Sequence, residues 1–186
     1  DQVDSVQEII KAGRHLLALI NEVLDLAKIE SGRIDLSLEP VNLDDLIEEC
    51  FSLVEPVAQQ YGVLVLKGDI DGHVVHADRT RLKQVLLNLL SNAIKYNRKG
   101  GTVILKVAAF NEDELRITVM DTGKGITEEQ QEQLFEPFNR LDAEDSEIEG
   151  TGIGLSITRN LVDMMGGTIG IESQPGLGSR FWVTLP

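Results

Sequence analysis

The chain has 186 residues, a formal net charge of −14 and a single cysteine. So acidic a chain is unsuited to broad binding of nucleic acids or anionic membranes, because both need a basic surface. The lone Cys50 excludes an internal disulfide and a cysteine-based zinc cluster, which favours a cytoplasmic location. No run of apolar residues reaches the length of a membrane span. Since the sequence begins with Asp1 rather than Met, we expect either a fragment of a longer protein or a processed chain.

Residues 2–30 are predicted to form one long helix. Its apolar residues recur in alternating steps of three and four, and a second row runs beside them in steps of seven. The first row is Val6, Ile9, Gly13, Leu16, Ile20, Val23 and Ala27, and the second is Ile10, Leu17 and Leu24. Together they make a face too wide for a two-stranded coiled coil and typical of a four-helix bundle. We therefore expect partner helices to cover it.

The remainder of the chain is predicted to be an α+β fold, a two-layer sandwich in which helices cover one face of a sheet. Helices are expected over 43–61, 78–96, 128–134 and 153–165, and strands over 33–38, 63–67, 74–76, 102–110, 114–120, 168–173 and 178–185. Pro40 should close the first strand, and Pro56 should kink or split the first helix. Asp78 is expected to cap the second helix. The boundary with the N-terminal helix is expected near residues 31–40.

A polar stripe interrupts the otherwise apolar helix 78–96. Asn88, Asn92 and Lys95 are spaced i, i+4 and i+7, so they share one face. Amide oxygens can bind Mg²⁺, and a lysine can pair with phosphate. The stripe alone is equally compatible with a solvated helix face.

Two glycine-rich segments follow. Residues 121–126 (Asp-Thr-Gly-Lys-Gly-Ile) come after an apolar strand, where an aspartate in an enclosed pocket could accept a hydrogen bond from an amino group such as that of adenine. A tight turn with a solvated aspartate is the alternative. Residues 150–155 (Gly-Thr-Gly-Ile-Gly-Leu) open a helix, and helix N-termini attract anions. They are not a dinucleotide fingerprint, because the acidic stretch 142–149 precedes them rather than a strand, and the chain has no P-loop.

In this order and spacing, the three segments resemble the N, G1 and G2 boxes of the histidine-kinase branch of the Bergerat-type (GHKL) ATPases. Residues 135–140 resemble the F box, and residues 176–179 the last glycine box. Residues 13–32 resemble the second helix of that family's dimerisation hairpin. The resemblance implies two parts, a partial hairpin over 1–32 and a catalytic ATP-binding domain over 33–186.

The resemblance implies ATP and Mg²⁺ as ligands and assigns roles at the base end. Asp121 would bind the adenine amino group, while Gly123 and Gly125 would shape the pocket wall beside Ile126. Tyr96 would border the sugar and base.

At the phosphate end, the resemblance makes Asn92 the Mg²⁺ ligand. Asn88 would contact the metal's water shell or a phosphate, and Lys95 would pair with phosphate. The residues expected to close on the phosphates are Gly150, Thr151, Gly152, Gly154 and Leu155. Residues 139–149 resemble the ATP lid, with Arg140 as a candidate γ-phosphate contact. Pro137 stands where many relatives carry an arginine, so the resemblance predicts one cationic contact fewer in this segment.

The implied reaction is transfer of the ATP γ-phosphoryl group to a histidine, as in a two-component phosphorelay for signal transduction. Such transfer needs positioning and charge neutralisation rather than a nucleophile from this domain. The acceptor would lie on the first hairpin helix, outside the chain; we interpret His15 as a flank residue of the long helix and His73 and His76 as structural. The implied partners are that first helix, a second copy through the N-terminal helix, and a response-regulator receiver domain, but no nucleic acid. The cytoplasmic part of a membrane-bound sensor fits this reading.

Three other functions share the fold. ATP hydrolases such as chaperones and topoisomerases place a glutamate, as water-activating base, where this chain has Asn88. A scaffold that has lost catalysis would not need every box intact. Serine-phosphorylating relatives are disfavoured by the long N-terminal helix, which supplies half of the bundle that presents a histidine.

Overall fold

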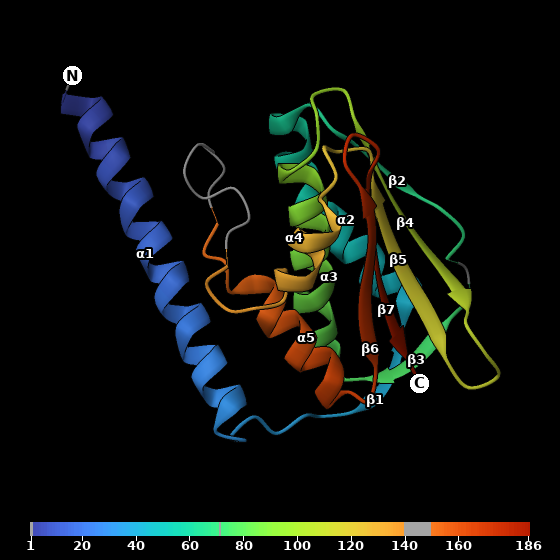
Figure 1. The fold of residues 1–186 in the computed structure, drawn as a ribbon. Coiled ribbons are helices and arrows are strands. Elements are labelled where there is room, and N and C mark those ends of the chain that lie inside the picture. The colour runs from blue at the N-terminus through green and yellow to red at the C-terminus, as the bar shows by residue number, and fades with distance from the viewer. Residues whose placement is uncertain (1, 71, 140–149) are drawn as a thin grey trace.

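The architecture is a five-stranded sheet with helices packed on one face and a long N-terminal helix standing apart (Figure 1). A computed structural model describes residues 2–70, 72–139 and 150–186. The sheet has the order β2-β4-β5-β7-β6, in which β2 is parallel to β4 and every other neighbouring pair is antiparallel. The strands are β2 (Leu64–Lys67), β4 (Thr102–Ala109), β5 (Leu115–Asp121), β6 (Thr168–Gln174) and β7 (Gly178–Leu185). The helices are α1 (Gln2–Glu30), α2 (Leu43–Tyr61), α3 (Arg79–Lys95), α4 (Glu128–Gln133) and α5 (Gly154–Met164). The predicted α+β sandwich is confirmed.

The pattern of buried and exposed residues along the central strands determines which face of the sheet the helices cover. Val103, Leu105 and Val107 of β4 are buried, as are Ile117 and Val119 of β5, and all five belong to one core. Side chains on successive residues of a strand point to opposite faces, so these residues form a single apolar surface. The helices α2, α3 and α5 contribute the opposing half of that core.

Helix α3 begins where the sequence predicted, because Asp78 supplies its N-cap. One carboxylate oxygen of Asp78 accepts a hydrogen bond from the Arg81 amide at 3.0 Å, and the other accepts from the Ser37 amide at 3.0 Å. The first bond satisfies one of the unpaired N–H groups at the helix start. The second ties the segment before β1 to this helix. The inward face of α3 consists of Leu82, Val85, Leu86, Leu89, Leu90, Ala93 and Ile94.

Helix α2 is unbroken through Pro56, so the predicted split of helix 43–61 does not occur. The alternative, a kink at Pro56, stays a prediction. A proline inside a helix removes one backbone hydrogen bond. Here that loss is offset by packing, because Cys50, Val54 and Ala58 on either side of the proline are buried against the core. Asn42 caps the start of α2 through its side chain, and Gly62 ends it in the left-handed conformation.

The strand predicted over 33–38 is also wrong. Those residues have no regular structure, and the strand β1 (Glu39–Asn42) instead runs through Pro40. Its antiparallel partner is β3 (Val74–Ala77), which is only four residues long and pairs with 39–42. Residues 33–38 alternate but have no partner strand. Pro40 is tolerated because this separate sheet has only two strands, so both are edges.

The apolar face of α1 is exposed to solvent. Nine large apolar residues of this helix are between 41% and 70% exposed, and they include every member of both predicted rows except the small residues Gly13 and Ala27. The helix packs mainly against α5, with Leu26 buried and Leu19 and Ile29 half-buried against the core. Among the described residues no helix has the length and apolarity to cross a membrane. The division of the chain into a hairpin part and a catalytic part stays a prediction.

Candidate nucleotide-binding site

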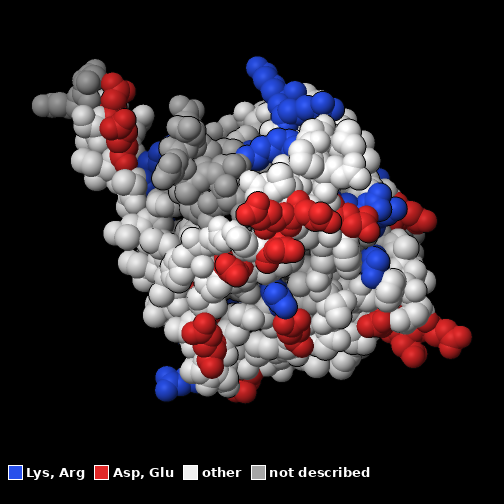
Figure 2. Space-filling model, in the orientation of Figure 1, with Lys and Arg blue, Asp and Glu red and all other residues white. Residues whose placement is uncertain are grey.

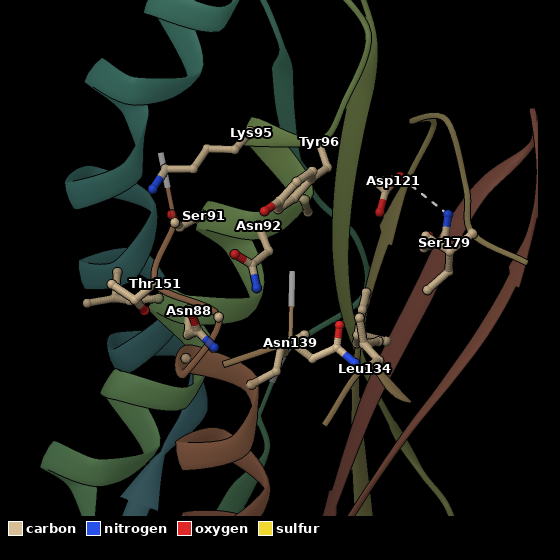
Figure 3. A pocket seen from close by; sticks show the side chains of 18 of the residues that line it. Asn88, Ser91, Asn92, Lys95, Tyr96, Asp121, Leu134, Asn139, Thr151 and Ser179 are labelled. Atoms are coloured by element: carbon tan, nitrogen blue, oxygen red, sulfur yellow. Dashed lines mark hydrogen bonds between the residues drawn. The ribbon is translucent and has the colours of Figure 1, made fainter. Parts of the chain in front are cut away.

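A cavity of about 430 Å³ lies between α3, the loop after β5 and the segment that leads into α5 (Figure 3). It brings together residues that are far apart in the sequence. The predicted site residues that line it are Asn88, Asn92, Lys95, Tyr96, Asp121, Gly125, Ile126, Gly150, Thr151, Gly152, Gly154 and Leu155. Two predicted residues remain. Gly123 lies behind the cavity wall, and Arg140, with the predicted lid beyond Asn139, lies outside the described residues.

Asp121 is the last residue of β5 and lines the cavity. Its Oδ1 accepts hydrogen bonds from the backbone amides of Gly123 at 2.8 Å and of Ser179 at 3.3 Å, the second of which is dashed in Figure 3. Within the described residues Oδ2 accepts no hydrogen bond, so it can accept one from a ligand. Burial raises the pKa of this carboxyl group above its usual value, and the two backbone hydrogen bonds act against that shift. Gly123 thus orients the aspartate rather than lining the cavity.

The glycines after Asp121 allow the loop to pack against its neighbours. Gly125 has a φ of +65°, and a Cβ there would lie 1.9 Å from the carbonyl oxygen of Gln174. A Cβ at Gly123 would lie 2.5 Å from the carbonyl oxygen of Tyr96. Neither position can accept a larger residue without movement of the backbone. The loop therefore holds the wall of the cavity close to β6 and to the end of α3.

The polar stripe of α3 faces the cavity, but its members are held differently. Asn88 donates a hydrogen bond to the Thr158 hydroxyl on α5 at 2.8 Å, which fixes its amide against the start of that helix. Asn92 points into the cavity (Figure 3), and within the described residues its amide has no hydrogen-bond partner. Lys95 lies one turn further along the same face. Asn92 is thus the member most available to a ligand.

The cavity meets the first turn of α5 at its other end. The N-cap position, Ile153, contributes no side-chain hydrogen bond to this helix, so the first amide groups are not capped by a side chain. Such amides attract anions. Thr151 lies beside them, and its hydroxyl accepts a hydrogen bond from the Ile153 amide at 3.3 Å. The Gly152 carbonyl accepts from the Phe138 amide at 2.9 Å, which ties this segment to residues 135–139.

Several residues that line the cavity were not named as site residues from the sequence, although Asn139 and Ser179 fall in the predicted lid and the last glycine box. These residues are Glu22, Leu87, Ser91, Ala93, Lys124, Leu134, Asn139, Ser179 and Phe181. Ser179 could have been found, because antiparallel pairing of β5 and β7 sets it opposite Asp121. Ser91 lies on α3 between Asn88 and Asn92 in sequence, within the segment already identified. Nothing in the sequence pointed to Glu22 as a site residue, because it lies on the N-terminal helix, 129 positions before Thr151, which it contacts.

Comparison with known proteins identifies the family. The model of the histidine kinase-, DNA gyrase B- and HSP90-like ATPases matches residues 77–186. The chain belongs to this family. It is 40% identical to the sensor histidine kinase GacS of Pseudomonas protegens over 99% of this chain and 21% of that protein. The predicted family and the histidine-kinase type of ATPase domain are confirmed.

Two solved structures share the fold. Full-length ShkA in complex with AMPPNP aligns with a TM-score of 0.88 at 33% identity, covering 100% of this chain and 38% of that one. The histidine kinase ThkA in complex with the response regulator TrrA aligns with a TM-score of 0.74 at 28% identity, covering 96% and 49%. The chain spans about a fifth of the length of curated relatives such as GacS.

Proposed function

We propose that this chain binds Mg²⁺-ATP in the cavity between α3 and α5 and supplies the kinase step of a two-component sensor, transferring the γ-phosphoryl group to a histidine outside these 186 residues. The observation that carries the proposal is the order of groups along the cavity. A half-buried carboxylate lies at one end and a helix start without a side-chain cap at the other, with the polar stripe of α3 between them. That order matches the base, metal and phosphates of a nucleotide.

The base end suits adenine. Since both backbone amides occupy Oδ1 of Asp121, the remaining oxygen can accept the adenine amino group. Ile126 and Phe181 supply apolar wall on which a flat base can pack. Tyr96 stands at the border with the sugar, where the Lys124 ammonium lies 5.9 Å from its ring centroid.

The phosphate end suits a nucleotide that brings its own metal. Among the described residues no group of three or more histidine, cysteine or acidic side chains is arranged to hold a metal. Mg²⁺ commonly takes one or two protein oxygens and obtains the rest from phosphates and water. Asn92, with an amide that points into the cavity, fits as that protein ligand. Bound Mg²⁺ would neutralise charge on the phosphates, while Lys95 and the first amides of α5 hold their oxygens.

Transfer is favoured over hydrolysis by the residue at position 88. Hydrolases of this fold need a carboxylate there to take a proton from water. The amide of Asn88 cannot accept that proton, and it is already engaged with Thr158. The domain therefore positions ATP and leaves the nucleophile to its partner.

The acceptor is proposed to be a histidine on a helix that covers α1. His76 belongs to β3, in the two-stranded sheet with β1, and His73 directly precedes β3. Neither histidine lines the cavity. His15 lines a neighbouring chamber on α1 but not the nucleotide cavity itself. The exposed apolar rows of α1 would pack against the first hairpin helix and against a second copy of the parent protein. A receiver domain would then take the phosphoryl group, as the complex of ThkA with a response regulator suggests.

The test has two parts. Calorimetric titration with Mg²⁺ and AMPPNP should show saturable binding. Radiolabelled ATP should then give no phosphoprotein with the chain alone, but an acid-labile, base-stable label on a histidine-bearing hairpin from a relative supplied in trans. Release of free phosphate without transfer would favour a hydrolase, and absence of nucleotide binding would favour a scaffold. If the chain labels itself, His15→Gln tells whether His15 is the acceptor.

The dimer can be tested separately. Analytical ultracentrifugation should show weak self-association that Leu16→Glu abolishes, because that residue is exposed on the apolar face of α1. A wild-type chain that remains monomeric at high concentration would count against association through this helix.

A further inference from the structure

Helix α1 reaches the nucleotide cavity through one side chain. Glu22 lines the cavity together with residues of α3 and α5, although it belongs to the N-terminal helix. Its carboxylate accepts a hydrogen bond from the hydroxyl of Thr151, in the segment that leads into α5. Glu22 therefore lies at the end of the cavity opposite Asp121, where the terminal phosphates of a nucleotide would be.

A second chamber of about 570 Å³ adjoins the cavity at this point. The two share Glu22, Lys95, Gly150 and Thr151 in their walls. The α1 side of the chamber carries Lys11, Arg14 and His15 as well as Glu22. Among the described residues that line this chamber, Glu22 is the only acidic one. Its negative charge thus stands among positive groups, at the entrance from the nucleotide cavity.

We propose that α1 forms the far wall of the phosphate site and that Glu22 is a specificity-determining residue, which sets how strongly the site favours nucleotides with a long phosphate chain. The inference rests on the proposed nucleotide site. The positive groups of the chamber attract terminal phosphates, and the carboxylate reduces that attraction. Without the charge of Glu22 the cavity should bind a nucleoside triphosphate more tightly. Its affinity for the nucleoside alone should not change, because a nucleoside occupies only the end of the cavity near Asp121.

The hydrogen bond from Thr151 to Glu22 also links the proposed phosphate site to the position of α1. The Thr151 hydroxyl donates its hydrogen bond to the Glu22 carboxylate, so a phosphate that accepts from this hydroxyl must replace Glu22. Any displacement of α1 moves the charge relative to the phosphates. Affinity for ATP and the placement of α1 are then coupled, and each must affect the other by the same factor.

The experiment compares Glu22→Gln with Glu30→Gln. Both remove one negative charge from α1, but Glu30 is exposed at the end of the helix and lines neither cavity. Titrations with Mg²⁺-AMPPNP and with adenosine should show that Glu22→Gln binds the triphosphate analogue about fivefold more tightly, since one charge acts across several ångströms of partly screened medium. Its affinity for adenosine should match the wild type, and the gain should shrink at high salt. Glu30→Gln should behave as the wild type with both ligands.

The outcomes separate this inference from the proposed function. If the wild type binds no AMPPNP, the nucleotide site is wrong and the role of Glu22 is wrong with it. If the wild type binds but Glu22→Gln does not exceed Glu30→Gln, or tightens adenosine equally, only the role of Glu22 is refuted. Glu22→Ala provides a further check, because glutamine keeps an oxygen that can accept from Thr151 and alanine does not. An effect in alanine alone would mean that Glu22 acts by holding the segment and not by its charge.

Discussion

Replacement of Asp121 by asparagine should remove most nucleotide affinity without harming the fold. The Gly123 and Ser179 amides both donate to Oδ1, so the asparagine must direct its own oxygen toward them. Its NH₂ group then occupies the place of Oδ2 and faces the cavity. An adenine amino group would meet a donor where it needs an acceptor.

The size of the loss follows from two terms. A hydrogen bond to a charged acceptor contributes about 1.5–3 kcal/mol, and an unsatisfied buried donor costs about 1–3 kcal/mol. Allowing for partial relaxation, the loss is about 3 kcal/mol, which is roughly a hundredfold in the dissociation constant.

The fold should not suffer, and the direction of the pKa shift explains why. Because burial raises the pKa of Asp121 in the folded state, the neutral carboxyl is the form that folding prefers. Its contribution to stability is present below the unfolded pKa and is lost as pH rises through the folded pKa. At pH 7 the ionised carboxylate therefore opposes folding, and asparagine, which carries no charge, does not.

The assay measures both quantities on three proteins. Asp121→Asn, the wild type and the surface control Asp113→Asn, which lies in the exposed β4–β5 turn, are titrated with Mg²⁺-AMPPNP and melted with and without it. The wild type and control should bind and gain thermal stability from the ligand, and Asp121→Asn should melt at or above the wild-type temperature and gain little. Binding by Asp121→Asn within threefold of the wild type would refute the assignment of the adenine end; a large drop in its melting temperature would refute the reasoning on the buried charge.

Three further predictions concern pH, the glycine loop and a helix cap. Calorimetry at decreasing pH should show affinity for AMPPNP falling as Asp121 is protonated, and because its pKa is raised the fall should begin at a higher pH than for an ordinary aspartate; Asp121→Asn should lack this component. Gly125→Ala should unfold at a lower urea concentration than Gly176→Ala. Both glycines have a positive φ, but a Cβ at Gly125 would clash with the Gln174 carbonyl, whereas a Cβ at Gly176 would have no atom within 4 Å. Equal losses of stability in the two variants would contradict the packing argument. Asp78→Ala should lower the free energy of unfolding by about 1–2 kcal/mol in urea titration, because α3 loses its N-cap; no change would mean that water replaces the cap.

The elements of the sandwich were predictable because their local signals agree with their packing. Asp78 marks the start of α3, and the apolar spacing that follows gives the face it buries. The stripe with Asn92 could be assigned to a cavity only through the family resemblance, because the spacing alone also fits a solvated face. The structure resolves this ambiguity, since the same stripe faces residues 150–155.

The failures share a physical cause, which is dependence on a distant partner. Residues 33–38 alternate like a strand, but a strand forms only where hydrogen-bond partners exist, and β3 reaches only as far as β1. Pro56 is a local break signal that tertiary packing overrides. The contact between Glu22 and Thr151 joins two segments that carry no mutual pattern in the sequence, so only their packing reveals it.

An acidic chain can still bind a polyanion as proposed, because the repulsion from surface carboxylates and the attraction inside the cavity act over different distances. Acidic side chains are spread over the face shown in Figure 2, and at physiological salt their field extends only about 8 Å into solvent. A ligand inside the cavity instead meets Lys95, the first amides of α5 and the positive side of the adjoining chamber. The surface charge thus disfavours extended polyanions such as nucleic acids, which cannot enter, while a single nucleotide escapes that repulsion once it is enclosed. Among the described residues that line the proposed phosphate end, Glu22 is the only acidic one. We therefore expect its charge to affect nucleotide affinity more than any carboxylate on the outer surface does.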